Sequence, residues 1–189
     1  MSSWRVLFLV LCSVLTPALC CNWIKHFGHL NGESLKLIKD MGGPLTEEQS
    51  PVPFPYRLYT RIQKEEVQSQ LVFIRDSLKM ISDLYSHDNL TPVTWDKVKL
   101  EHFLSSIHRQ TVELNRCVPP SKRVNRKLRN YYRRLTRCTL DRTCCSAASW
   151  ELIRKETKQH LGHLDLLMNP IKANDAASRG RSTPSQPIN

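Results

Sequence analysis

Two histidine pairs have the spacing that most suggests metal or acid–base chemistry. His26 and His29, and likewise His160 and His163, are three positions apart, so both rings of a pair can share one helix face. A structural zinc site needs four ligands, and a catalytic one needs three plus water. No cysteine or carboxylate completes either pair at a recognised spacing, and the chain has no nucleophile elbow, Gly-rich phosphate loop or His-Glu-x-x-His motif. We therefore expect no metal, no cofactor and no enzyme.

A basic run is the second feature that could carry chemistry. It spans residues 122–137 and holds eight cations and no acid, interleaved with Tyr131 and Tyr132. Such a run can bind polyanions, or it can be the solvated face of a helix whose other side is packed. Apolar residues recur through it at helical spacing, which favours the solvated face. Weak binding of heparan sulfate stays a hypothesis, without specific nucleic acid, and its candidate residues are Lys122, Arg123, Arg126, Lys127, Arg129, Arg133, Arg134 and Arg137.

The first twenty residues decide the compartment. One early cation, Arg5, precedes the apolar run 6–15, and small residues follow at a cleavage site that ends in Cys20. Ten apolar residues are too few to span the ~30 Å of a bilayer as a helix. The pattern predicts a signal peptide over residues 1–20 and a secreted, extracellular protein without a transmembrane segment in its mature form. A buried N-terminal helix is the weaker alternative.

Cysteines and a sequon bear on the mature protein. Its five cysteines are an odd number, so at least one thiol is free or pairs with another chain. One of the adjacent Cys144 and Cys145 could pair with Cys138 or with a second chain. Asn89 begins an Asn-Leu-Thr sequon, but Pro92 directly after it argues against its use, so glycosylation stays open.

The elements that must position these residues are helices. Apolar residues step by three and four over 22–41, 67–85, 93–117, 124–138 and 150–168. Gly42-Gly43-Pro44 ends the first helix, and residues 42–60 contain four prolines, which predicts a long extended loop. Parallel neighbouring helices need such a connection. We expect an all-α, up-up-down-down helical cytokine bundle over residues 21–169, with a fifth helix in the second crossover. A disordered tail is expected over residues 170–189.

The length indicates the number of domains, and the net charge indicates the kind of partner. The chain has 189 residues, which suits one domain, and a formal net charge of +11 with 24% charged and 40% hydrophobic residues. That composition is globular, and the basic excess favours anionic partners.

Several stretches resemble the type I interferons of the fish group with two framework cysteines. They are Cys21-Asn22-Trp23-Ile24, Met41-Gly42-Gly43, Phe54-Pro55, Val93-Thr94-Trp95-Asp96-Lys97, Asn115-Arg116-Cys117-Val118-Pro119 and Trp150-Glu151-Leu152-Ile153-Arg154-Lys155-Glu156-Thr157-Lys158. Single pieces are weak, but their order over residues 21–168 is specific. The resemblance implies a cytokine that bridges two chains of a class II cytokine receptor, a type I interferon receptor, and induces antiviral genes through receptor-bound kinases.

The resemblance also assigns residues. It implies a framework disulfide between Cys21 and Cys117, core packing for Trp150, and a receptor contact at Arg154. Because Ile153 and Thr157 continue the apolar stripe, we expect the Arg154 guanidinium at its edge, in solvent. Further receptor-binding candidates are Lys155 and Lys158 on the same helix, with Phe54, Tyr56 and Arg57 chosen by their place in the long loop.

The basic helix also allows an alternative function from another class. A cationic host-defence protein could act directly on microbial membranes or polyanions through the basic helix over residues 122–137. Retained killing after a change at Arg154 that abolishes signalling would favour it. A secreted ribonuclease is a third and weaker alternative, because the chain lacks a catalytic motif.

Overall fold

The fold is built from helices, and the part of the chain that the structure describes contains no strand. The computed structural model describes residues 21–86, 90, 92–120 and 124–180. Its helices are α2 (Asn22–Asp40), α3 (Tyr56–Ile62), α4 (Val67–Tyr85), α5 (Lys97–Cys117), α6 (Arg126–Leu135) and α7 (Ala147–Gly180). A π-helical turn (Thr136–Leu140) and a 3-10 turn (Asp141–Thr143) follow α6. The predicted all-α class is confirmed.

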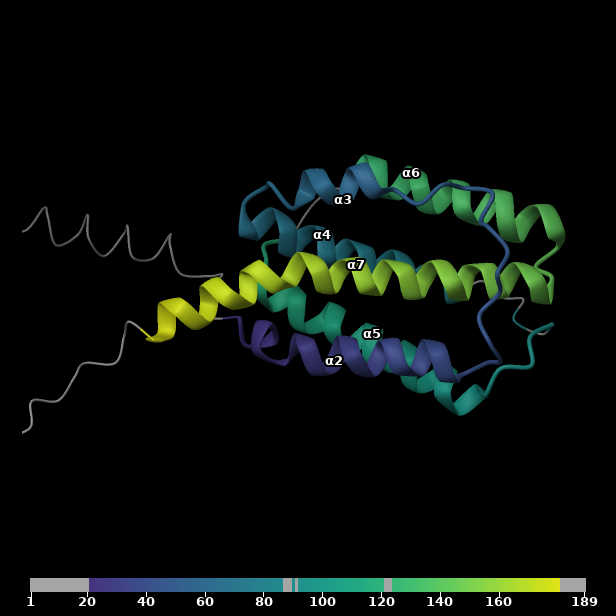
Figure 1. Ribbon diagram of the computed structural model, residues 1–189, viewed down its shortest axis with the longest axis horizontal. Coiled ribbons are helices and arrows are strands. Elements are labelled where there is room, and N and C mark those ends of the chain that lie inside the picture. Colours follow the sequence, from purple (N-terminus) through teal and green to yellow (C-terminus); the bar gives the residue numbers. More distant parts are fainter. Residues whose placement is uncertain (1–20, 87–89, 91, 121–123, 181–189) are drawn as a thin grey trace, which may run out of the picture.

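The helix directions follow the predicted order. A disulfide between Cys21 and Cys117 joins the start of α2 to the end of α5. At the other end of this pair, the Asp96 backbone N–H donates to the Met41 carbonyl over 2.7 Å. The two helices are therefore antiparallel, and Figure 1 shows α2 and α4 running one way and α5 and α7 the other. The up-up-down-down bundle and the framework disulfide are both confirmed, with α6 as the extra helix between α5 and α7.

The long connection between α2 and α4 passes across α7 and then along the upper edge of the bundle (Figure 1). We call residues 41–66 the crossover. Its first part is extended, as the prolines predict, but Tyr56 begins the short helix α3. The expectation of an extended loop through residue 60 is therefore wrong for its last five residues. Leu58, Tyr59 and Ile62 are buried, so the helical turn forms to pack these three side chains onto the bundle.

The core is continuous along the bundle and contains the stripes that the spacing predicts. Trp150 is fully buried, as expected. The largest apolar side chains that are fully buried include Trp23, Phe27, Leu71, Ile74, Leu78, Ile81 and Phe103. Each such side chain contributes about 1.5–3 kcal/mol relative to exposure, so the core rather than the Cys21–Cys117 disulfide carries most of the stability.

The last helix is longer than the sequence predicts. A proline inside a helix costs about 3 kcal/mol, so Pro170 was expected to end it. Instead α7 continues through Pro170 to Gly180. Ile171 is buried beyond the proline, and the Lys172 ammonium lies 4.8 Å from the centre of the Phe27 ring and 3.6 Å from Asp165. These contacts offset the cost, and a disordered tail from residue 170 is wrong; residues 181–189 and the predicted signal peptide lie outside the described residues.

Among the described residues, no helix is both long enough and apolar enough to cross a membrane.

Candidate functional site

Arg154 is an interior residue. Its side chain has no exposed area, although its position at the edge of the apolar stripe predicted a guanidinium in solvent. That expectation is wrong because the end of α2 and the start of the crossover cover this edge of α7. A direct receptor contact by Arg154 therefore has no support from its geometry.

The Arg154 guanidinium binds backbone carbonyls at the end of α2. Nη1 donates to the carbonyls of Ile38 and Lys39 over 3.2 and 3.1 Å, and Nη2 donates to those of Gly43 and Pro44 over 2.7 and 3.3 Å. The last four carbonyls of a helix have no partner within it, and a cation there is favoured by the helix dipole. Arg154 thus caps α2 and fixes the first residues of the crossover.

A carboxylate completes this arrangement. Glu151 Oε2 accepts from Arg154 Nε over 2.8 Å and pairs with Nη2 at 2.7 Å, while its Oε1 accepts from Trp95 Nε1 over 2.6 Å. A Cβ added at Gly42 would lie 2.8 Å from Trp95 Cδ1 and 3.2 Å from Arg154 Cζ. Only glycine fits this contact. We call Trp95, Glu151, Arg154 and Gly42 the Arg154 network; it joins the end of α2, the crossover, α7 and the segment that precedes α5.

Farther along, an aromatic cluster holds the crossover against α6 and α7. The Phe54 ring stacks on Tyr59 and His163 with centroids 5.5 and 4.8 Å apart. His160 shares a hydrogen bond of 2.6 Å with the Tyr59 hydroxyl and stacks on Tyr132. Phe54 is therefore a half-buried anchor of the crossover, and its receptor contact stays a prediction.

Two titratable groups are enclosed by this cluster. Burial, with a smaller contribution from His163, lowers the pKa of His160 to about 3, so its ring is neutral at physiological pH. Burial raises the pKa of Glu156, whose carboxylate accepts a hydrogen bond of 2.7 Å from the Tyr131 hydroxyl. Among the described residues, His160 Nε2 has no hydrogen-bond partner. His160 and His163 do share one helix face, where both rings pack against Phe54 with centroids 4.6 and 4.8 Å from it.

A partly exposed side of α7 contacts the crossover, and its polar residues Lys155, Lys158 and Gln159 are half-buried. Lys155 Nζ donates to the Glu48 carbonyl over 2.7 Å, and Gln159 Nε2 donates to the Tyr56 hydroxyl over 2.7 Å. Tyr56 keeps 55% of its area exposed and Arg57 is exposed as well. We call the exposed surface of Tyr56, Arg57, Lys155, Lys158 and Gln159 the crossover–α7 face. Of the predicted contacts, Tyr56 and Lys155 take part in these two hydrogen bonds, Arg57 directly follows Tyr56 in α3, and Lys158 lies about one turn after Lys155 in α7.

The predicted cationic helix has its charges outward. Six cations of the run are exposed: Arg126, Lys127, Arg129, Arg133, Arg134 and Arg137. We call these six the α6 basic face. Lys122, Arg123 and the sequon residue Asn89 lie outside the described residues.

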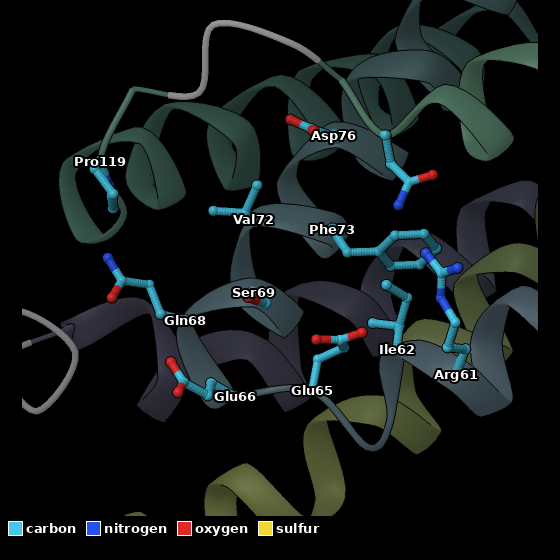
Figure 2. Close-up of a pocket in the computed structure, with 11 residues that line it drawn as sticks. Arg61, Ile62, Glu65, Glu66, Gln68, Ser69, Val72, Phe73, Asp76 and Pro119 are labelled. Carbon is cyan, nitrogen blue, oxygen red and sulfur yellow. The ribbon is translucent and has the colours of Figure 1, made fainter.

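One hollow in the surface was not predicted by any motif. It encloses about 440 Å³ between α3, α4 and the start of α6, with Ile62 and Phe73 among its walls (Figure 2). Asp76 lines it, but its carboxylate is bound by the Arg75 guanidinium at 2.8 Å. Its described lining contains the carboxylates of Glu65 and Glu66 and the Ser69 hydroxyl, but no histidine or cysteine. Nor does any group of three or more potential metal ligands gather among the described residues.

Three cysteines remain unpaired in the described structure. Cys138 is half-buried, Cys144 is exposed and Cys145 is buried. Cys144 and Cys145 both adopt left-handed backbone conformations, with φ of 49° and 58°. The predicted pairing of one of them with Cys138 does not occur within the chain.

A bundle of this topology, with an overhand crossover laid across its last helix, defines a helical cytokine. Residues 24–170 match the family model described as interferon alpha/beta domain. The chain is 41% identical over 168 residues to interferon a3 of Oncorhynchus mykiss, covering 88% of this chain and 95% of that one. The chain belongs to the type I interferon family.

Solved structures agree with this assignment. Zebrafish interferon 1 superposes with a TM-score of 0.71 at 32% identity, covering 78% of this chain and 97% of the zebrafish chain. Zebrafish interferon 2 superposes with a TM-score of 0.57 at 20% identity, covering 75% of this chain and 97% of that one, and this likeness supports the fold alone. The family that the sequence motifs predicted is thereby confirmed.

Proposed function

We propose that this chain is a secreted ligand that bridges two chains of a class II cytokine receptor. Bridging would activate kinases bound to the receptor tails and induce antiviral genes. Membership of the type I interferon family supports the class of activity. The crossover–α7 face is the observation that supports a specific binding surface.

The chemistry of this face suits a protein partner. Tyr56 presents a large exposed ring that is backed by Phe54 at 4.8 Å between centroids, so little side-chain freedom is lost on binding. Tyrosine and arginine are enriched among the residues that dominate interface energetics. Arg57, Lys155 and Lys158 add positive charge, which complements an acidic receptor surface and accelerates association. Arg154 supports the face from beneath as a positioning residue.

A cell assay tests the proposal. Cells that respond to interferon are treated with the mature protein, and antiviral transcripts are measured with and without soluble receptor ectodomain as competitor. We expect induction that the ectodomain suppresses. A double variant, Tyr56→Ala with Lys155→Glu, should lose at least about tenfold in potency, since each tenfold corresponds to only ~1.4 kcal/mol of binding free energy.

The matched control carries the same types of change elsewhere. Val98 and Lys36 are exposed on α5 and α2, so Val98→Ala with Lys36→Glu removes exposed apolar area and reverses one charge away from the face. This control should retain full potency. Induction that persists unchanged in excess ectodomain would reject receptor bridging, and microbial killing without receptor would favour the host-defence alternative.

A further inference from the structure

The α6 basic face is a single-signed surface. With about 100° of rotation per residue, its six cations cover an arc of about 160° on the outward side of the helix. The only other residue on this arc is Asn130, and α6 contains no acid. A solvated helix face usually mixes both signs and forms pairs between residues four apart. Among the described residues, no ion pair joins any of the six cations to a carboxylate.

The spacing of these charges makes them act together. From Arg126 to Arg137 the helix rises about 16 Å, because each residue adds ~1.5 Å. Six charges over that length are on average about 3 Å apart along the helix axis, which is shorter than the ~8 Å Debye length of physiological salt, so salt does not fully screen neighbouring charges from one another. A long anion that follows the helix would meet several cations at once and release the counterions that each attracts.

The apolar, buried side of α6 limits which kinds of partner the α6 basic face can bind. Leu128 and Leu135 are fully buried, and the Tyr131 hydroxyl donates to Glu156 in the aromatic cluster. A helix that binds a membrane surface must insert its apolar side. That side is already in the core here, so the partner must be recognised through charge alone, from solvent.

The cations themselves favour oxyanions. Five of the six are arginines, whose planar forked donors can bind two oxygens of one anionic group. We propose that the α6 basic face binds a sulfated polysaccharide of the heparan sulfate class. This function goes beyond receptor bridging and uses none of the residues of the crossover–α7 face. Its consequence is retention of the secreted protein in the sulfated matrix at cell surfaces.

Binding to immobilised heparan sulfate tests the proposal with charge-matched variants. The first reverses three cations of the α6 basic face: Arg129→Glu, Arg133→Glu and Arg137→Glu. The control reverses three exposed cations of α2, namely Lys25→Glu, Lys36→Glu and Lys39→Glu, and changes the net charge by the same amount. We expect the α6 variant to lose at least about tenfold in affinity and to show a shallower dependence of affinity on salt, while the control changes little.

Further measurements make the outcome decisive. Circular dichroism melts establish that each variant is folded. If the charge reversals unfold the protein, the same positions are changed to glutamine instead of glutamate and the binding measurement is repeated. Equal losses in the α6 variant and the control, or no binding by the unaltered protein at physiological salt, would overturn the proposal. Binding to vesicles of anionic phospholipid with none to heparan sulfate would also overturn it. On cells without heparan sulfate the α6 variant should signal normally, which separates this site from the receptor-binding face.

Discussion

Replacing Arg154 with alanine should destabilise the fold instead of removing a receptor contact. The substitution deletes the donors to four backbone carbonyls and leaves Glu151 without its cation. Two of those carbonyls, on Ile38 and Lys39, belong to the last turn of α2, where no backbone partner is available. The cavity is enclosed, because Arg154 has no exposed area, so water cannot easily replace the lost donors.

The magnitude follows from the burial of Arg154, which has no exposed area, whereas the Glu151 side chain is 28% exposed. Removing one partner of a buried ion pair costs about 3–5 kcal/mol, and a domain of this size shifts its melting temperature by about 2–4 °C per kcal/mol. Arg154→Ala should therefore lower the melting temperature by about 6–20 °C. Arg154→Lys should recover only part of the loss, because a single ammonium group cannot reach both pairs of carbonyls and Glu151 at once.

Thermal melts monitored by circular dichroism measure this effect. Lys155→Ala is the matched control, since Lys155 is the neighbouring cation and its bond to the Glu48 carbonyl is exposed. We expect its melting temperature to change by no more than about 2–3 °C. An unchanged melting temperature in Arg154→Ala, together with weakened receptor binding, would refute the interior role and restore the direct contact that the family resemblance implies.

Three further predictions concern stability. Removing the disulfide by Cys117→Ala should cost about 4–5 kcal/mol in the chain-entropy model, because the bond closes a loop with a sequence separation of 96, and denaturant titration measures the loss. A chain that ends at Asn169 should be less stable by about 1.5–3 kcal/mol than one that ends at Ala176, since it lacks buried Ile171; equal stability would show that the end of α7 does not contribute. Because the pKa of His160 is lower in the folded state than its ordinary 6.5, the unfolded chain binds the proton first, and stability should fall as pH drops below 6.5. The loss should reach about 1 kcal/mol at pH 5.5 in the unaltered protein and be smaller in His160→Gln, whereas identical pH profiles would exclude His160 as the cause.

Local patterns predicted the helices well where one face is apolar throughout. The steps of three and four over 67–85 coincide with α4, because every position of that stripe packs in the bundle. The four prolines also predicted an extended connection after α2, and a long connection is required because α2 and α4 run parallel. The end of α7 was missed because the local cost of Pro170 is visible in the sequence, but the burial of Ile171 is not.

The role of Arg154 shows what spacing along one helix cannot give. Its position relative to Ile153 and Thr157 is right, but the carbonyls that bind it belong to residues 38–44, more than a hundred positions away. Two local signals were available: Glu151 three residues earlier, and a Gly-Gly pair after α2. Glu151 by itself could equally form a surface ion pair with Arg154, and the Gly-Gly pair could equally form a flexible turn. Neither signal shows that Arg154 is buried and packs against Gly42. Periodicity predicted the outward charges of α6 because its apolar stripe is complete.

The crossover–α7 face is tested most directly by binding kinetics on immobilised ectodomains of both receptor chains. The unaltered protein is compared with Lys155→Glu plus Lys158→Glu, and with Lys25→Glu plus Lys36→Glu on α2 as a control of equal charge. We predict that the α7 variant binds at least one receptor chain at least about tenfold more weakly, with slower association, while its melting temperature and the control's affinity remain unchanged. Full affinity of the α7 variant for both chains, or an equal loss in the control, would contradict the assignment of this face to the receptor.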